Sequence, residues 1–131
     1  MTIRYEANPP KILPGIDPNE SIQKFVEKIK IISNKCDAIH LTENVLGFQR
    51  VSPIEVGRII RKEIPNLPIT VSLRVRDKSE MEISEFVEKC VSIGFSGILI
   101  LMIGFCMPWN PPTHPVQEDL LEGIYFLEMG N

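Results

Sequence analysis

Apolar residues in this chain fall into short continuous runs separated by longer stretches with helical spacing. The short runs predict four strands, at Ile3–Glu6, Ala38–Leu41, Pro68–Val75 and Ile98–Met102. Between the strands, apolar residues recur every three or four positions, which predicts amphipathic helices. One strand and one helix together take about 30 residues, the size of a βα unit. The pattern therefore predicts an α/β fold with a parallel sheet.

Each predicted helix opens on the same capping signal. A side chain that accepts hydrogen bonds is followed three residues later by Glu, at Asp17–Glu20, Ser52–Glu55 and Ser79–Glu82. In the first two, proline directly follows the cap, at the helical position that needs no N–H partner. These spacings predict three capping boxes. Gly94 stands where a left-handed residue would end the third helix.

The sequence after the fourth predicted strand is less regular. Ile103–Pro115 is rich in proline, while Val116–Leu127 has apolar residues at helical spacing. Ile124–Met129 fits a fifth strand equally well, so both alternatives stay open at this end of the chain.

The overall composition is that of an ordinary globular domain, and it argues against several classes of protein. The 131 residues include 14 Lys and Arg against 17 Asp and Glu, and this net charge of −3 argues against a nucleic-acid binder. Cys36, Cys90 and Cys106 lack CxxC spacing, so we predict no metal site and a reducing, cytoplasmic location. No apolar leader follows Met1. Glycine and proline interrupt the uncharged run Cys90–Gln117, which favours a buried strand over a membrane span of ~20 apolar residues.

Candidate chemistry gathers where the predicted strands end. Ligands of parallel sheets bind beyond the carboxyl ends of the strands. Glu6 ends the first strand shortly before Pro9 and Pro10, which cannot continue a sheet ladder. Its carboxyl is a candidate general acid if burial beside these prolines raises its pKa, and a solvated strand-end Glu is the alternative. Thr42 and Asn44 follow the second strand with a hydroxyl and an amide suited to a polar heterocycle.

Two arginines and two histidines are further candidates. Arg74 and Arg76, at the end of the third strand, either meet a carboxylate or phosphate or form exposed ion pairs. His40 lies among apolar neighbours in the second strand, where a hydrogen-bonded core histidine is favoured over a ligand. His114 lies between prolines, where a turn or N-cap role is expected.

Four short motifs occur in order along residues 3–103. They are the aromatic-Glu-x-x-Pro-Pro end of the first strand at Tyr5–Pro10, the Asp-x-x-x-x-Thr pattern at Asp37–Thr42, the Arg-Asp pair at Arg76–Asp77 and the Gly-hydrophobic-Leu strand at Gly97–Leu101. Together these motifs resemble the methylenetetrahydrofolate reductase family. By this resemblance we expect one domain over 1–131, with a divergent C-terminal segment at 104–131.

The resemblance implies parallel βα repeats forming about half of a TIM (β/α)8 barrel. It implies a flavin, FAD with FMN as the alternative, that takes hydride from NAD(P)H and reduces methylenetetrahydrofolate to methyltetrahydrofolate. By the same resemblance, Glu6 is the catalytic acid that protonates the folate or related pterin, and Thr42 contacts the flavin. Asn44, Ser72 and Arg74 are the further residues expected at the cofactor site.

The chain departs from the family pattern at the third and fourth strands. Ser72 stands where many members have His, and Gly104–Phe105 replaces an acidic flavin contact. A complete barrel takes ~250 residues. We therefore expect the chain alone to bind flavin weakly, and to form a homo-oligomer or pair with a second polypeptide that completes the barrel. The alternative is a non-catalytic half-barrel binding or assembly subunit, or an inactive truncated remnant.

Overall fold

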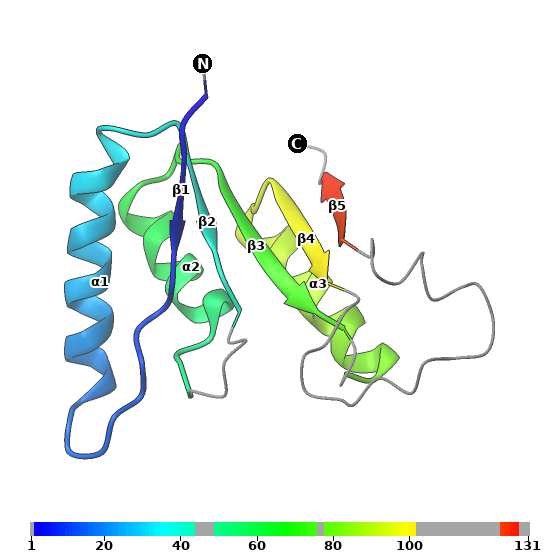
Figure 1. Cartoon of the computed structure of the whole chain (residues 1–131), viewed down its shortest axis with the longest axis horizontal. Helices are drawn as coiled ribbons and strands as arrows, with labels where there is room; N and C mark the ends of the chain where they lie inside the picture. Colours follow the sequence, from blue (N-terminus) through cyan, green and yellow to red (C-terminus); the bar gives the residue numbers. More distant parts are fainter. Residues whose placement is uncertain (1, 44–48, 76–77, 102–123, 129–131) are drawn as a thin grey trace.

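The computed structural model is an α/β sheet with its three helices packed on one side (Figure 1). It describes residues 2–43, 49–75 and 78–101, and the backbone of 124–128. The candidates Asn44, Arg76 and His114 lie outside the described residues. In chain order the elements are β1 (Arg4–Ala7), α1 (Pro18–Ser33), β2 (Ala38–Leu41), α2 (Pro53–Glu63), β3 (Ile69–Arg74), α3 (Glu80–Ile93), β4 (Gly97–Leu101) and β5 (Ile124–Glu128).

The helices begin at the predicted caps, although only one of the three capping boxes is complete among the described hydrogen bonds. The Asp17 carboxylate accepts from the Asn19 N–H at 3.0 Å, and the Ser52 hydroxyl accepts from the Ile54 N–H at 3.2 Å. Both caps bond the second helical residue, where a capping box bonds the third. In α3 the Ser79 hydroxyl accepts from the Glu82 N–H while the Glu82 carboxylate accepts from the Ser79 N–H, so this box is confirmed.

The end of α3 also follows the prediction. Gly94 caps the helix with φ +88°, a left-handed conformation that costs other residues free energy because of their Cβ. The Gly94 N–H donates to the carbonyls of Cys90 and Val91. These bonds give hydrogen-bond donors to two carbonyls at the end of the helix that have no partner within it.

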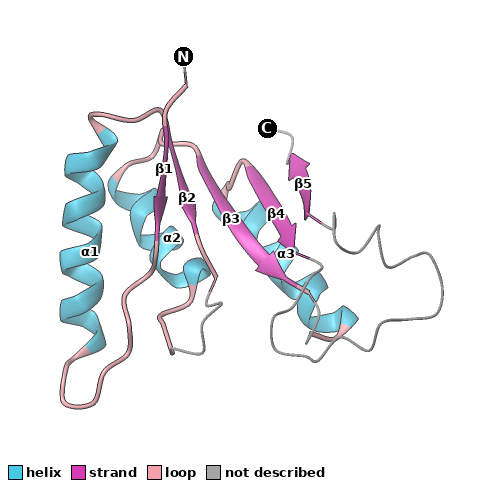
Figure 2. Ribbon diagram, viewed as in Figure 1, coloured by secondary structure: helices cyan, strands magenta, loops and turns pink. Residues whose placement is uncertain are grey.

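The first four strands form a parallel sheet in their sequence order. Figure 2 shows β1 to β4 running in one direction and β5 in the other. β5 pairs antiparallel with β4, from Gly97 opposite Glu128 to Leu101 opposite Ile124. The strand alternative for the C-terminal segment is therefore confirmed over Ile124–Glu128, while 104–123 lie outside the described residues.

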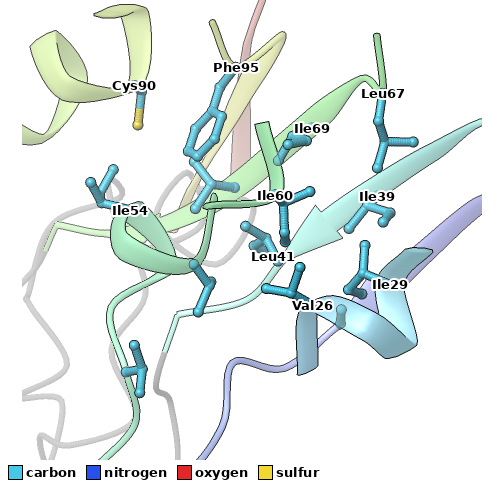
Figure 3. Close-up of a cluster of buried hydrophobic side chains, with 14 of the residues drawn as sticks. Val26, Ile29, Ile39, Leu41, Ile54, Ile60, Leu67, Ile69, Cys90 and Phe95 are labelled. Atoms are coloured by element: carbon cyan, nitrogen blue, oxygen red, sulfur yellow. The ribbon is translucent and has the colours of Figure 1, made fainter. Parts of the chain in front are cut away.

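One face of this sheet forms the hydrophobic core with the helices. Figure 3 shows Val26 and Ile29 of α1 facing Ile39 and Leu41 of β2. Phe95 lies so close to Gly57 that a Cβ there would fall 2.2 Å from the phenylalanine ring, which fixes how α2 meets the chain entering β4. The buried strand side chains of this face are Ala7, Ile39, Leu41, Ile69, Val71, Leu73 and Ile98.

The loops that follow β1 and β2 are tied to each other. The Ile12 N–H donates to the Gln49 carbonyl at 2.8 Å, and the Val51 N–H donates to the Pro10 carbonyl at 2.9 Å. The Arg50 guanidinium also donates to the Pro9 carbonyl at 2.7 Å. These bonds hold the edge of the sheet where both strands end. Within the described part of the chain, no helix has the length and apolar character needed to cross a membrane.

Candidate functional site

A row of polar residues crosses the sheet on the face away from the helices. The parallel register places Glu6 opposite His40, and His40 opposite Thr70. Because strand side chains alternate between faces, Arg4 and Ser72, two positions away along their strands, lie on this same face. The alternation therefore separates an apolar face under the helices from a polar face on the other side.

A cavity of about 450 Å³ opens on the polar face, within the usual range of small-molecule sites. Three of the predicted site residues, Glu6, Thr42 and Ser72, come together there from three different strands and their ends. Leucines of β4 supply an apolar wall beside these polar groups. Among the residues that the structure describes, the lining is Arg4, Glu6, His40, Thr42, Ser72, Leu99 and Leu101.

His40 is the central polar side chain of this face. Its Nδ1 lies 2.7 Å from the Thr70 hydroxyl, and its Nε2 lies 2.7 Å from the Ser72 hydroxyl. All three side chains are buried, with 8% of His40, 1% of Thr70 and 5% of Ser72 exposed. The expectation of a hydrogen-bonded core histidine is confirmed, and the imidazole also lines the cavity.

Burial sets the protonation of this histidine. Desolvation lowers the pKa of His40 from its ordinary value of 6.5 because the charged imidazolium loses its hydration. The negative charge of Glu6 opposes this effect and the positive charge of Arg4 adds to it. His40 is therefore a neutral imidazole at pH 7, able to donate from one nitrogen and accept at the other.

The side chain of Glu6 is exposed, which agrees with the alternative of a solvated Glu at the strand end. The burial beside Pro9 and Pro10, on which a raised pKa of this carboxyl depended, is not observed. Glu6 belongs to β1, which forms the edge of the described sheet and has a neighbouring strand only on the β2 side. Pro9 is buried against the rest of the protein, but the Glu6 carboxylate faces the open cavity.

Thr42 is held at the rim of the cavity by the end of β1. Its N–H donates to the Ala7 carbonyl at 3.1 Å, which extends the parallel ladder by one residue beyond β2. Its hydroxyl donates to the side-chain oxygen of Asn8. The end of β1 and the residue that follows it therefore hold both the backbone and the side chain of Thr42 in place.

Arg74 does not line the cavity, although it follows Ser72 by two residues on β3. The backbone N–H of Arg74 donates to the Glu43 carboxylate, which also forms an ion pair with Lys78. Lys78 donates in addition to the Arg74 carbonyl at 2.7 Å. Glu43 thus joins the ends of β2 and β3 beside the cavity, a structural role that the sequence reading did not assign.

Arg4 is a charged cavity residue that was not predicted from the sequence, nor were the apolar Leu99 and Leu101. Its guanidinium Nη1 donates to the Thr70 hydroxyl at 3.0 Å, across the intervening strand β2. The signal was present in the alternation of Arg4 with Glu6, of His40 with Thr42 and of Thr70 with Ser72, which puts one set of polar residues on one face. Among the described residues, no group of three or more His, Cys, Asp or Glu could hold a metal ion.

A second cavity, of about 560 Å³, lies between α2 and α3. Its lining is dominated by long side chains at the helix surface, which keep much of their freedom in water and form weak ion pairs. Positive and negative groups balance there, so the lining has no clear preference for a charged ligand. The charged residues are Arg58, Lys78 and Lys89, with Glu55, Glu82 and Glu85.

Together, the described residues form an α/β fold with a cavity of mixed polar and apolar lining on the face of the sheet away from the helices. No protein-family model matches the chain, and no curated protein matches it at a significant level.

The lowered pKa of His40 gives the stability of the fold a defined pH dependence. Because the unfolded chain binds this proton more readily, the contribution of His40 to the free energy of unfolding is fully present above the unfolded pKa of 6.5 and is lost as pH drops through the folded pKa. Urea unfolding between about pH 7 and about pH 5.5 should show this loss in wild type and a shallower slope in His40→Gln, by at most about 1.4 kcal/mol per pH unit. Equal slopes in the two proteins would contradict the assignment.

Proposed function

We propose that the polar-face cavity binds a flavin and a reduced pterin, and that the protein acts as a methylenetetrahydrofolate reductase-like oxidoreductase. The observation that carries this proposal is the meeting of Glu6, Thr42 and Ser72 in one cavity. The sequence resemblance assigns Glu6 to the acid and Thr42 to a flavin contact, and Ser72 is an expected cofactor-site residue at a position where many family members have His. The three residues lie far apart along the chain, and the register of the sheet brings them to one place.

The topology supports a partial TIM barrel. Neighbouring strands β1 to β4 follow their sequence order and all three helices lie on one face, as in a (β/α)8 barrel. A doubly wound sheet reverses its strand order and carries helices on both faces. In a barrel the face away from the helices points inward, so the polar face with Glu6, His40 and Ser72 corresponds to the barrel interior.

The cavity lining fits a planar heterocycle with polar edges. Leu99 and Leu101 offer an apolar surface for a ring, and the hydroxyls of Thr42 and Ser72 reach its heteroatoms. A bound flavin would supply the hydride that it accepts from NAD(P)H. Glu6, exposed at the cavity, is placed to give a proton to a nitrogen of methylenetetrahydrofolate and so open the way to the reactive iminium form.

Flavin binding is the first test of this proposal. Titration of FMN or FAD with the protein, followed by flavin fluorescence, should give saturable binding with a Kd of about 10 μM or weaker, because few polar groups line the cavity. Ser72→Ala removes one of these groups and should weaken binding about tenfold. Ser92→Ala is the matched control, since Ser92 lies at an exposed position of α3 and its hydroxyl bonds only the Lys89 carbonyl among the described contacts. No saturation in wild type, or equal losses in both variants, would argue against the proposal.

The role of Glu6 is tested by separating the two half-reactions. Glu6→Gln keeps the size of the side chain and removes its acid, so reduction of methylenetetrahydrofolate should fall about 100-fold or more while flavin reduction by NAD(P)H continues. Glu27→Gln, at an exposed position on α1, is the control and should match wild type. Unchanged methylenetetrahydrofolate turnover in Glu6→Gln would remove Glu6 from the mechanism.

A second candidate function is that of a half-barrel assembly subunit, and the distribution of exposed apolar side chains favours it. Four of the seven large apolar residues that are exposed among the described ones lie within residues 3–16, in the segments that precede and follow edge strand β1 in the sequence: Ile3, Ile12, Leu13 and Ile16. Edge strands with apolar surroundings tend to associate with another chain. We infer that a second copy of the chain covers this edge.

A cytoplasmic location of the protein also stays a prediction.

Light scattering tests the assembly directly. Wild type at micromolar concentration should have the mass of a dimer or larger oligomer. The double variant Leu13→Lys with Ile16→Lys should be monomeric, because two buried charges at the interface cost more than the contact gains. Val91→Lys, which changes an exposed apolar residue of α3, should keep the wild-type mass. A well-folded monomeric wild type would refute the assembly.

A further inference from the structure

Four side chains form a continuous chain of hydrogen bonds across β1, β2 and β3. The Arg4 guanidinium bonds the Thr70 hydroxyl at 3.0 Å, and Thr70 bonds Nδ1 of His40 at 2.7 Å. Nε2 of His40 then bonds the Ser72 hydroxyl at 2.7 Å. The chain begins at a residue that can only donate and ends at a hydroxyl that lines the cavity.

The arginine fixes the direction of the first bond. A guanidinium has no acceptor atom, so the Thr70 oxygen must accept from Arg4. The hydrogen of Thr70 then needs an acceptor, because Thr70 is 1% exposed and a buried donor without a partner is costly. Among the described contacts of this hydroxyl, that acceptor is Nδ1 of His40.

The direction of the first hydrogen bonds determines which nitrogen of the His40 imidazole carries the hydrogen. A neutral histidine that accepts at Nδ1 carries its hydrogen on Nε2, so Nε2 donates to the Ser72 oxygen. Burial favours the neutral ring by lowering the pKa of His40. A doubly protonated ring would donate to Thr70 and leave the hydrogen of that buried hydroxyl without its acceptor. The Ser72 oxygen is therefore supplied with a donor, and its own hydrogen remains free to point into the cavity.

We propose that the Arg4–Thr70–His40–Ser72 chain fixes Ser72 as a hydrogen-bond donor and thereby selects ligands that present an acceptor to β3. This inference rests on the proposed function, in that it takes the polar-face cavity as the ligand site. The acceptor is a ring carbonyl oxygen or an unprotonated ring nitrogen. Thr70 and His40 are positioning residues, and Thr70 acts without lining the cavity.

The same polarity orients a heterocycle within the cavity. The Glu6 carboxylate accepts hydrogen bonds when ionised, whereas Ser72 donates. A lactam edge, with its C=O toward Ser72 and its N–H or amino group toward Glu6, matches both residues. Oxidised flavins and pterins carry such an edge. A ring that presents N–H to Ser72 would leave two donors facing each other.

The tautomer of His40 tests the proposal without any ligand. Long-range ¹H–¹⁵N spectra of the uniformly ¹⁵N-labelled full chain at neutral pH distinguish a protonated from an unprotonated ring nitrogen. The sequence has two histidines, so His114→Gln assigns the signals. We expect Nε2 of His40 to carry the hydrogen and Nδ1 to be unprotonated. A ring protonated on Nδ1, or on both nitrogens, would overturn the proposal.

A matched pair of variants tests the effect on the ligand. Thr70→Val removes the hydroxyl that donates to Nδ1, so Ser72 is free to turn its hydrogen toward Nε2, and FMN affinity should fall about tenfold. Thr70→Ser keeps the hydroxyl and should retain wild-type affinity. The His40 signals should change in Thr70→Val and stay as in wild type in Thr70→Ser.

The outcomes separate this inference from the proposed function. Wild-type FMN affinity in folded Thr70→Val would overturn the positioning role, whereas equal losses in both variants would indicate a packing role and overturn it as well. If Thr70→Val does not fold, the tautomer of His40 in wild type and the FMN affinity of Thr70→Ser still test the positioning role. If wild type binds no FMN, the proposed function fails, and the tautomer of His40 alone then tests the direction of the hydrogen bonds from Arg4 to Ser72.

Discussion

The parallel register of β1, β2 and β3 is the constraint on which the rest of the structure depends. It places Glu6, His40 and Thr70 in one row and Ala7, Leu41 and Val71 in the next. A slip of one residue in β2 would turn His40 into the core beneath the helices and Leu41 out of it. The packing of the helices and the chemistry of the polar face are therefore set by the same pairing.

The polar face is stable because its buried groups satisfy one another. Thr70 and Ser72 are as buried as core residues, yet each hydroxyl bonds the imidazole between them. Hydroxyls suit this place because they both donate and accept, so their hydrogens turn to match a neutral histidine. The cavity lies over these hydrogen-bonded side chains. Their hydrogen bonds therefore determine which donors and acceptors face the cavity.

The sequence predicts the elements well because their signals are local. Caps such as Ser79 with Glu82, and Gly94 in a left-handed conformation, depend on residues within a few positions of each other. The rule that parallel strands end at one edge also brought Glu6 and Thr42 together correctly. The alternation of Arg4 with Glu6 puts Arg4 on the polar face, but its bond to Thr70 depends on the order and register of three strands, which no local pattern carries. Whether Glu6 is buried or exposed depends on what covers the β1 edge, so the sequence left both alternatives open, and the structure shows an exposed side chain.

The central claim is that a heterocycle binds on the polar face of the sheet, away from the helices. The most direct measurement is a map of backbone amide chemical shifts of the full chain during addition of FMN. The account predicts saturable changes concentrated at Thr42, Ser72, Leu99 and Leu101, with little change along α2 and α3. Changes concentrated in the cavity between α2 and α3, around Arg58 and Lys89, or no saturable change, would contradict it.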